Sequence, residues 1–143
     1  RVISERADQG HSEAALAGVA AAEEEGAACV VLLAIDCPLL DPHELDRLLT
    51  GVPEHYVTVV PDRHGSGTNA LVLAPPGAIA PAFGEGSCAR HLAAARAAGI
   101  PHGVEELASL GLDIDTPADI VALARALEEH PGRAKRTAKA LGI

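Results

Sequence analysis

Apolar and polar residues alternate along the chain in blocks that predict a repeating order of helices and strands. An Ala-rich block at residues 12–25 indicates a helix, and Gly26 is a typical C-terminal stop for it. The next nine residues, 27–35, are all apolar. Their length and β-branched content predict a strand that is buried on both faces, as is typical of parallel sheets.

Helix caps and shorter apolar runs predict the remaining elements. Asp41 followed by Pro42, and Thr116 followed by Pro117, combine an N-cap residue with proline at the first helical position. Helices are expected at residues 12–25, 41–49, 87–98 and 116–129, and strands at 27–35, 56–60, 70–73, 102–107 and 112–115. This alternation predicts an α/β layered domain with a mostly parallel sheet.

The composition agrees with one globular domain. Of the 143 residues, 48% are hydrophobic and 22% are charged, a balance that excludes a disordered chain. We assign residues 1–132 to the domain and 133–143 to a basic C-terminal tail. No apolar run reaches the roughly 18 residues of a membrane span, and no secretory leader is visible. Because the chain has no methionine and opens in a structured-looking segment, we expect its natural N-terminus to be missing.

Charge and cysteine content narrow the function classes. Eleven basic residues against twenty acidic ones give a net charge of −9. Four of the basic residues lie in the last eleven positions, so the rest of the chain is strongly acidic and would repel nucleic acid. The basic end could touch RNA or acidic partners, but a solvated, frayed end is the simpler interpretation. Three cysteines without a C-x-x-C pair indicate reduced thiols in a cytoplasmic protein.

Three aspartates follow or flank predicted strands, where open α/β sheets bind their ligands. Asp36 closes the long apolar run, and Asp113 and Asp115 share one face of the short strand predicted around Ile114. Carboxylates without a His or Cys pattern favour Mg²⁺ or Mn²⁺ over zinc. Two alternatives stay open: Asp36 could bond backbone amides in a turn, and Asp115 could be a helix-start residue.

Two glycine loops could bind anions. Residues 65–68 (GSGT) offer closely spaced backbone N–H groups, although an ordinary turn is at least as good an interpretation. Residues 83–87 (FGEGS) lead into a helix whose N-terminus favours a phosphate or carboxylate, and Gly86 would allow close backbone approach. The alternative is a flexible loop with Ser87 as the N-cap. His64 and His91 lie near these loops and are expected at the surface.

Four segments in this order resemble the 2-phospho-L-lactate/phosphoenolpyruvate guanylyltransferases of coenzyme F-420 biosynthesis. They are residues 32–40 (LLAIDCPLL), 61–71 (PDRHGSGTNAL), 83–87 (FGEGS) and 112–117 (LDIDTP). The resemblance covers about residues 10–130. It implies a three-layer α/β/α nucleotidyltransferase fold, related to the molybdopterin-cofactor nucleotidyltransferases, with a mixed sheet that contains one antiparallel strand.

The resemblance also implies an activity and a set of site residues. The enzyme would transfer GMP from GTP to the phosphate of phosphoenolpyruvate or 2-phospho-L-lactate and release pyrophosphate. Asp36, Asp113 and Asp115 would hold Mg²⁺ against the acceptor phosphate. Thr68, Gly84 and Ser87 would contact the acceptor's carboxylate end. An Ala-, Gly- and Arg-rich composition hints at a GC-rich bacterial genome and thus at phosphoenolpyruvate.

The family's N-terminal strand and triphosphate-binding loop have no counterpart in these 143 residues, and residues 9–15 match the family's nucleotide-side segment poorly. We therefore expect the chain to bind phosphoenolpyruvate with Mg²⁺ but to bind GTP weakly. Two other functions remain open. A molybdopterin-cofactor type of nucleotidyltransferase is disfavoured by the loop at residues 63–69, and a non-catalytic domain would bind the acceptor without any transfer.

Overall fold

A computed structural model of the chain describes residues 10–130 and 132–142. Within them the helices are α1 (His11–Glu24), α2 (Pro42–Leu49), α3 (Ser87–Ala97), α4 (Pro117–Glu129) and α5 (Lys135–Leu141). The strands are β1 (Val30–Leu33), β2 (Tyr56–Pro61), β3 (Thr68–Ala74) and β4 (His102–Val104). None of these helices is both long enough and apolar enough to cross a membrane.

The four strands form one mixed sheet in the order β1-β3-β2-β4. Strand β3 is antiparallel to both of its neighbours, and β4 is parallel to β2. Three strands therefore run in one direction and β3 alone runs in the other, which confirms the mixed sheet with one antiparallel strand. Because β3 is reversed, its first residue, Thr68, lies at the end of the sheet where β1 and β2 finish.

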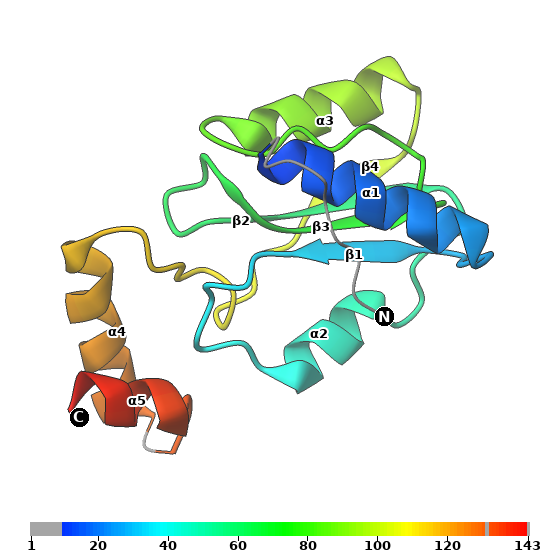
Figure 1. Ribbon diagram of the computed structural model, residues 1–143. Helices are drawn as coiled ribbons and strands as arrows, with labels where there is room; N and C mark the ends of the chain where they lie inside the picture. Colours follow the sequence, from blue (N-terminus) through cyan, green and yellow to red (C-terminus); the bar gives the residue numbers. More distant parts are fainter. Residues whose placement is uncertain (1–9, 131, 143) are drawn as a thin grey trace.

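Helices cover both faces of the sheet, which confirms the three-layer α/β/α architecture. Helices α1 and α3 lie on one face and α2 on the other (Figure 1). An apolar core lies on each face of the sheet, and successive residues of a strand point alternately into one core and the other. Val57 and Leu71 pack with Val19 of α1 and Ala95 of α3. Val60 and Ala70 belong to the second core, against which Leu48 of α2 packs.

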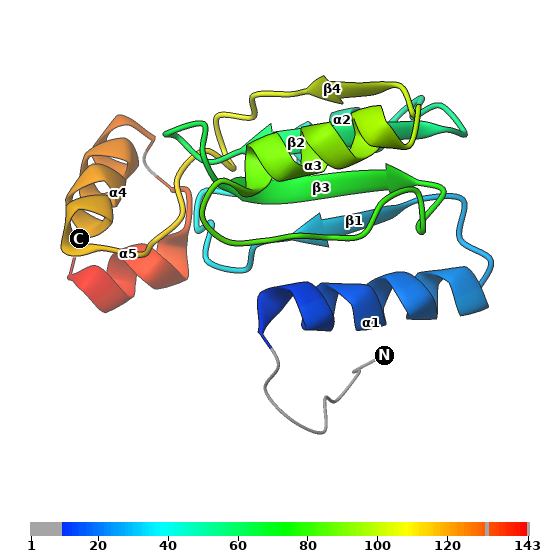
Figure 2. The same ribbon diagram turned by 90° about the horizontal axis from the view of Figure 1, so that it is seen from above.

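Helices α4 and α5 lie beyond the end of the sheet at which β1 finishes (Figures 1 and 2). A third apolar cluster holds them there, and it consists of Leu39, Leu112, Leu123 and Leu127, with Ala134 and Ala138 packed against it. Arg133 Nη2 adds an ion pair with Asp41 Oδ2 at 2.9 Å. The basic end of the chain is thus helical and packed instead of frayed.

Three details of the structure differ from the strands that the sequence predicts. The predicted buried strand at 27–35 is reduced to β1, which is only half-buried because it pairs on one side with β3 among the described residues. Ile35 is fully exposed in the turn that follows. The strand buried throughout is β3, which has a neighbour on each side. Residues 112–115 form no strand, and β4 ends at Val104.

Candidate functional site

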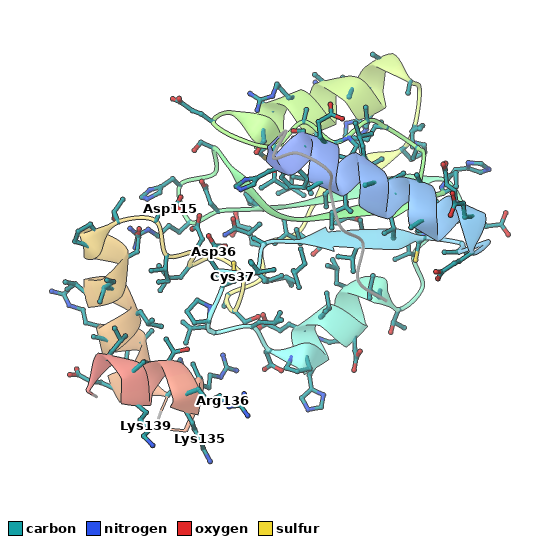
Figure 3. All side chains as sticks on the ribbon, viewed as in Figure 1. Asp36, Cys37, Asp115, Lys135, Arg136 and Lys139 are labelled. Atoms are coloured by element: carbon teal, nitrogen blue, oxygen red, sulfur yellow. The ribbon has the colours of Figure 1, made fainter. Side chains whose placement is uncertain are left out.

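Asp36 lies in a turn just beyond β1, at the edge where the parallel strands end. Its side chain is exposed, while the next residue, Cys37, is buried in the second core. Figure 3 shows the two side by side, with Asp115 nearby. Within the described part of the chain, the Asp36 carboxylate accepts no hydrogen bond from a backbone amide, so the alternative of a turn-capping role is not what the structure shows.

The segment that carries Asp113 and Asp115 is tied to the sheet through the carbonyl of Leu110. The Asn69 side chain donates to this carbonyl from Nδ2 at 2.7 Å, and Cys37 donates from Sγ at 3.7 Å. Asn69 is buried at the start of β3. These two bonds bring a segment from late in the chain to the end of β1. Sequence reasoning did not single out Asn69, because a lone asparagine beside a predicted strand carries no distinctive signal.

The three aspartates are close enough to influence one another. The charge of Asp113 is the main cause that raises the pKa of Asp115, followed by burial and then by Asp36 and Asp119, while His11 opposes the rise. Burial, with help from Asp36 and Asp113, raises the pKa of the Cys37 thiol to about 12. Cys37 is therefore a protonated, inert thiol, and the aspartates form a cluster of repelling charges.

A cluster of oxygen ligands that repel one another matches the chemistry of a hard divalent cation, which would relieve the repulsion. Among residues 10–130 and 132–142, however, no three His, Cys, Asp or Glu side chains stand close enough to form a ready metal site. The carboxylates would have to turn toward a common point on binding. The donor chemistry fits the expected Mg²⁺, and the side chains are not yet gathered around it.

Asp119 fixes the backbone at Asp115. Its Oδ2 accepts from the backbone N–H of Thr116 (2.7 Å) and of Asp115 (3.2 Å) and from the Thr116 hydroxyl (2.7 Å). Its other oxygen binds Arg63. The Thr116 hydroxyl bond is the largest cause that holds the pKa of Asp119 below its ordinary value. Thr116 is the N-cap of α4, so the helix-start role considered for Asp115 is wrong, and its carboxylate stays exposed.

The glycine turn at residues 65–68 already contains an anion, the side chain of Asp62. Its carboxylate accepts from the backbone N–H groups of His64 (3.0 Å), Ser66 (3.0 Å) and Gly67 (2.8 Å). Burial opposes ionisation of Asp62, but these bonds outweigh it and hold the pKa below its ordinary value. The N–H of Gly65 bonds to the Asp62 carbonyl. The turn is therefore structural, and its amides are not open to a ligand.

The second glycine loop, at residues 83–87, has the opposite character. The Arg90 guanidinium donates to the carbonyls of Ala82, Phe83 and Glu85, and so draws the carbonyl side of the loop toward itself. In the described structure, the N–H groups of Gly84, Glu85 and Gly86 donate to no protein atom. Free amides backed by a cation are typical of an anion-binding loop. Gly84 and Gly86 have φ values of 105° and 71°, which favour glycine.

Thr68 and Ser87 meet beside this loop. The Ser87 hydroxyl donates to Thr68 Oγ1 at 3.0 Å, and the Ser87 N–H donates to the Gly84 carbonyl at 3.0 Å. Ser87 is the first residue of α3 and Gly86 is the N-cap, so the alternative role of Ser87 as the N-cap is wrong. The structure thus brings together all four residues expected to bind the acceptor, which are Thr68, Gly84, Gly86 and Ser87.

His91 is part of this group and is not a surface residue. It is fully buried, its Nδ1 lies 3.1 Å from Thr68 Oγ1, and its Nε2 accepts from the Ala82 N–H at 2.8 Å. Burial, with a smaller contribution from Arg90, lowers the pKa of His91 to about 4. The four-residue spacing from Ser87 could have revealed its place on the buried face of α3. His64, in contrast, is exposed as expected.

The start of α1 lies between the aspartates and the acceptor loop. The Ser12 hydroxyl accepts from the Phe83 N–H at 3.0 Å, and His11 lies close enough to Asp115 to lower the pKa of its carboxyl. Figure 1 shows this end of α1 beside the segment that leads into α3. The basic side chains of α5 do not join the site: Lys135, Arg136 and Lys139 point away from Asp36 and Asp115 (Figure 3).

Comparisons with known proteins identify relatives of this chain. The chain is 45% identical over 138 residues to a phosphoenolpyruvate guanylyltransferase of Conexibacter woesei, covering 94% of this chain and 61% of that protein. It is 46% identical over 99 residues to a phosphoenolpyruvate guanylyltransferase of Sphaerobacter thermophilus, covering 69% of this chain and 48% of the relative. A 3-phospho-D-glycerate guanylyltransferase of Phenylobacterium zucineum is 38% identical over 126 residues, with 87% and 58% covered.

The chain thus spans about half to three-fifths of the length of these relatives. A family model described as "Guanylyl transferase CofC like" matches residues 2–137, and this range contains every site residue discussed above. Because the family model matches most of the chain, we conclude that the chain belongs to the guanylyl transferase CofC-like family.

Proposed function

We propose that this protein transfers GMP from GTP to the phosphate of a small phosphorylated carboxylic acid, with phosphoenolpyruvate as the first choice. The observation that carries the proposal is the loop at residues 84–86, whose three free amides lie beside the Thr68–Ser87 hydroxyl pair. This loop shares one edge of the sheet with the aspartates. The names of two relatives and the resemblance to the F-420 enzymes support the same acceptor.

The acceptor would bind through its two charged ends. Its carboxylate would accept hydrogen bonds from the N–H groups of Gly84 and Gly86 and from the Thr68–Ser87 hydroxyl pair, with the Arg90 charge behind the loop. Its phosphate would face Asp36, Asp113 and Asp115. These carboxylates would repel a phosphate on their own, so the arrangement requires a cation between them, and we propose Mg²⁺. When bound, the ion would neutralise charge on the reacting phosphates.

The reaction needs positioning more than proton transfer. An oxygen of the acceptor phosphate forms a bond to the α-phosphorus of GTP, and the bond from that phosphorus to the bridging oxygen of the leaving group breaks. Pyrophosphate departs with the bonding electron pair. The attacking oxygen is already anionic at pH 7, so the step requires no general base. His91 could not serve as one, because burial lowers its pKa to about 4 and its Nε2 already accepts from the Ala82 N–H. The loop and the hydroxyl pair therefore act by holding the acceptor in line.

Pyrophosphate release tests the activity, and calorimetry tests the acceptor site separately. The protein is incubated with GTP and Mg²⁺ and with phosphoenolpyruvate, 2-phospho-L-lactate, 3-phospho-D-glycerate or no acceptor. Since we expect weak GTP binding, GTP is supplied in large excess; release should be slow, should require an acceptor and should be highest with phosphoenolpyruvate. Faster turnover of 3-phospho-D-glycerate would move the assignment to the acceptor in the name of the Phenylobacterium relative. Acceptor binding without any release would favour a non-catalytic acceptor-binding domain.

Two buried serines provide a matched pair for the binding test. Ser87→Ala removes a hydroxyl that bonds to Thr68, whereas Ser109→Ala removes a buried hydroxyl near Glu44 of α2, outside the acceptor loop. We expect Ser87→Ala to weaken phosphoenolpyruvate binding roughly tenfold, with Ser109→Ala equal to the wild type. Equal affinity in both variants would contradict the assigned acceptor site.

A further inference from the structure

The state of the Thr68–Ser87 hydroxyl pair depends on which nitrogen of His91 carries the proton. The His91 ring is fully buried and meets the Phe83 ring edge-on, with centroids 5.2 Å apart. A backbone N–H can only donate, so the contact from the Ala82 N–H requires Nε2 to be the unprotonated nitrogen. The ring is then neutral with its hydrogen on Nδ1, and this hydrogen is donated to Thr68 Oγ1.

A count of hydrogens shows what this tautomer does to the pair. A hydroxyl oxygen has two lone pairs and one hydrogen. Thr68 Oγ1 accepts from Ser87 and from His91, so both of its lone pairs are used. Its own hydrogen has no protein acceptor in the described structure. If the Thr68–Ser87 bond ran the other way, the unused hydrogen would belong to Ser87, so one donor is left over in either case.

The opposite tautomer would remove this donor. With Nδ1 unprotonated, Thr68 would donate to His91 and Ser87 would donate to Thr68, so no hydroxyl hydrogen would remain. We propose that His91 is a positioning residue of the acceptor site, whose Nδ1–H keeps one hydroxyl hydrogen of the Thr68–Ser87 pair free to bind the acceptor's carboxylate. His91 acts through Thr68 and does not touch the acceptor itself.

The unused hydroxyl hydrogen is buried, so water cannot readily accept from it. Thr68 and Ser87 are 8% and 1% exposed, so water satisfies little of their hydrogen-bonding capacity. A hydroxyl that is buried with an unused donor is costly unless a ligand accepts from it. The free amides of Gly84 and Gly86 lie on the adjoining loop. An anion that enters there would meet backbone and hydroxyl donors together.

The first test is nitrogen NMR of the histidine rings in the protein at pH 7. We expect His91 to be neutral, with a protonated Nδ1 and an unprotonated Nε2. A His91 ring that is protonated on Nε2 alone, or on both nitrogens, would overturn the proposal. This test needs no ligand, so it remains decisive for the hydrogen-bond arrangement even if the proposed function fails.

The second test rests on the proposed function and uses phosphoenolpyruvate as the probe in calorimetry with Mg²⁺. His91→Phe keeps the ring shape but removes both ring nitrogens. The Thr68–Ser87 pair then keeps an unused hydrogen but loses the Nδ1–H that orients Thr68, so we expect affinity to fall severalfold, up to roughly tenfold. Thr68→Val, which removes the hydroxyl itself, should lose roughly ten- to hundredfold, the usual range for a hydrogen bond to a charged group, and Thr68→Ser, which keeps the hydroxyl, should retain most of the affinity. His102→Phe, on β4, serves as the matched control and should bind like the wild type.

Coupling between the two residues separates positioning from a general structural role. If His91 acts only through Thr68, then adding His91→Phe to Thr68→Val should cause no further loss of affinity, even though the melting temperature falls again. Losses that multiply in the double variant would overturn the proposal. Wild-type protein that binds no phosphorylated acid would refute the proposed function and, with it, the acceptor half of this inference.

Discussion

At the scale of single residues, the site contains two ionisable groups that are perturbed in opposite ways. His91 is held neutral because it is buried and its Nε2 is used by a backbone N–H. Asp115 is exposed, yet its pKa is raised, chiefly by the charge of Asp113. The folded state therefore disfavours a charge at both positions, and this preference has measurable consequences for stability.

The stability of the protein should fall in mild acid because of His91. The pKa of His91 is lowered from 6.5 to about 4 in the folded state, so between these values only the unfolded chain takes up the proton. The free energy of unfolding should thus decrease as the pH falls from 6.5 to 4, by on the order of 3 kcal/mol. Chemical denaturation across this range should show the decrease in the wild type and a smaller one in His91→Phe. An equal decrease in both would contradict this origin.

Removing one charge from the aspartate cluster should have opposite effects on stability and on binding. Without metal at neutral pH, Asp115→Asn should be slightly more stable than the wild type, because repulsion from Asp113 is relieved. This gain should disappear as the pH falls through the raised pKa of Asp115. Phosphoenolpyruvate affinity in Mg²⁺ should fall more than tenfold by calorimetry. Asp46→Asn, the same change on exposed α2, is the control, and unchanged affinity in Asp115→Asn would refute the metal assignment.

At the scale of secondary structure, the two ends of α3 use the same backbone conformation for different purposes. Gly86, the N-cap, has φ 71°, and Gly99, just after the helix, has φ 68°. The amide of Gly99 is used within the helix end, where it donates to the Arg96 carbonyl, whereas the amide of Gly86 donates to no protein atom in the described chain. A comparison of substitutions at Gly86 and Gly99 can therefore distinguish an effect of backbone strain from an effect on ligand binding.

Alanine at these two glycines should therefore cost similar stability but differ in binding. A left-handed conformation costs a non-glycine residue roughly 1–2 kcal/mol. An added Cβ meets Arg90 Nη1 at 3.4 Å in Gly86→Ala and meets nothing within 4 Å in Gly99→Ala. Thermal unfolding should show comparable losses, and calorimetry should show weaker phosphoenolpyruvate binding only for Gly86→Ala. A matching loss of affinity in Gly99→Ala would mean that the loop has no special role.

The elements that sequence could predict are those specified by local chemistry. The four predicted helices are present to within about two residues, since caps such as Thr116 and stops such as Gly26 act within one turn. The prediction of a strand at residues 112–115 was wrong, because alternation predicts which side chains are buried and not whether a neighbouring strand is there to pair with. For residues 65–68 the sequence left an anion-binding loop and an ordinary turn open, because Asp62, which fills the turn, lies outside the glycine motif.

At the scale of the whole molecule, the site is assembled on one edge of the sheet from distant parts of the chain. Asp36 follows β1, Thr68 begins the reversed strand β3, and the loop before α3 lies against Thr68. The segment that carries Asp115 is held by Asn69 on one side and by α4 on the other. Grouping of this kind depends on tertiary contacts, so sequence spacing alone could not give it.

Helices α4 and α5 should be able to unfold separately from the sheet. They are held by their own apolar cluster, in which Leu123 is only 1% exposed, whereas Leu71 lies at the centre of the sheet. Each change to alanine should cost about 2–5 kcal/mol. In hydrogen exchange, Leu123→Ala should lose protection in α4, α5 and residues 112–116 only, and Leu71→Ala should lose it throughout. Uniform loss in both variants would show a single cooperative unit.

The turn that Asp62 fills also constrains how this protein can change by mutation. An added Cβ at Gly67 would lie 2.7 Å from Asp62 Oδ2, although the backbone of Gly67 is not in the left-handed region. Gly67→Ala should thus be harmful while Asp62 is present and tolerated once Asp62→Ala has removed the carboxylate. The unfolding free energies of the two single variants and the double variant should show less than additive losses. The two positions are an epistatic pair, in which the cost of changing Gly67 depends on whether Asp62 is still present.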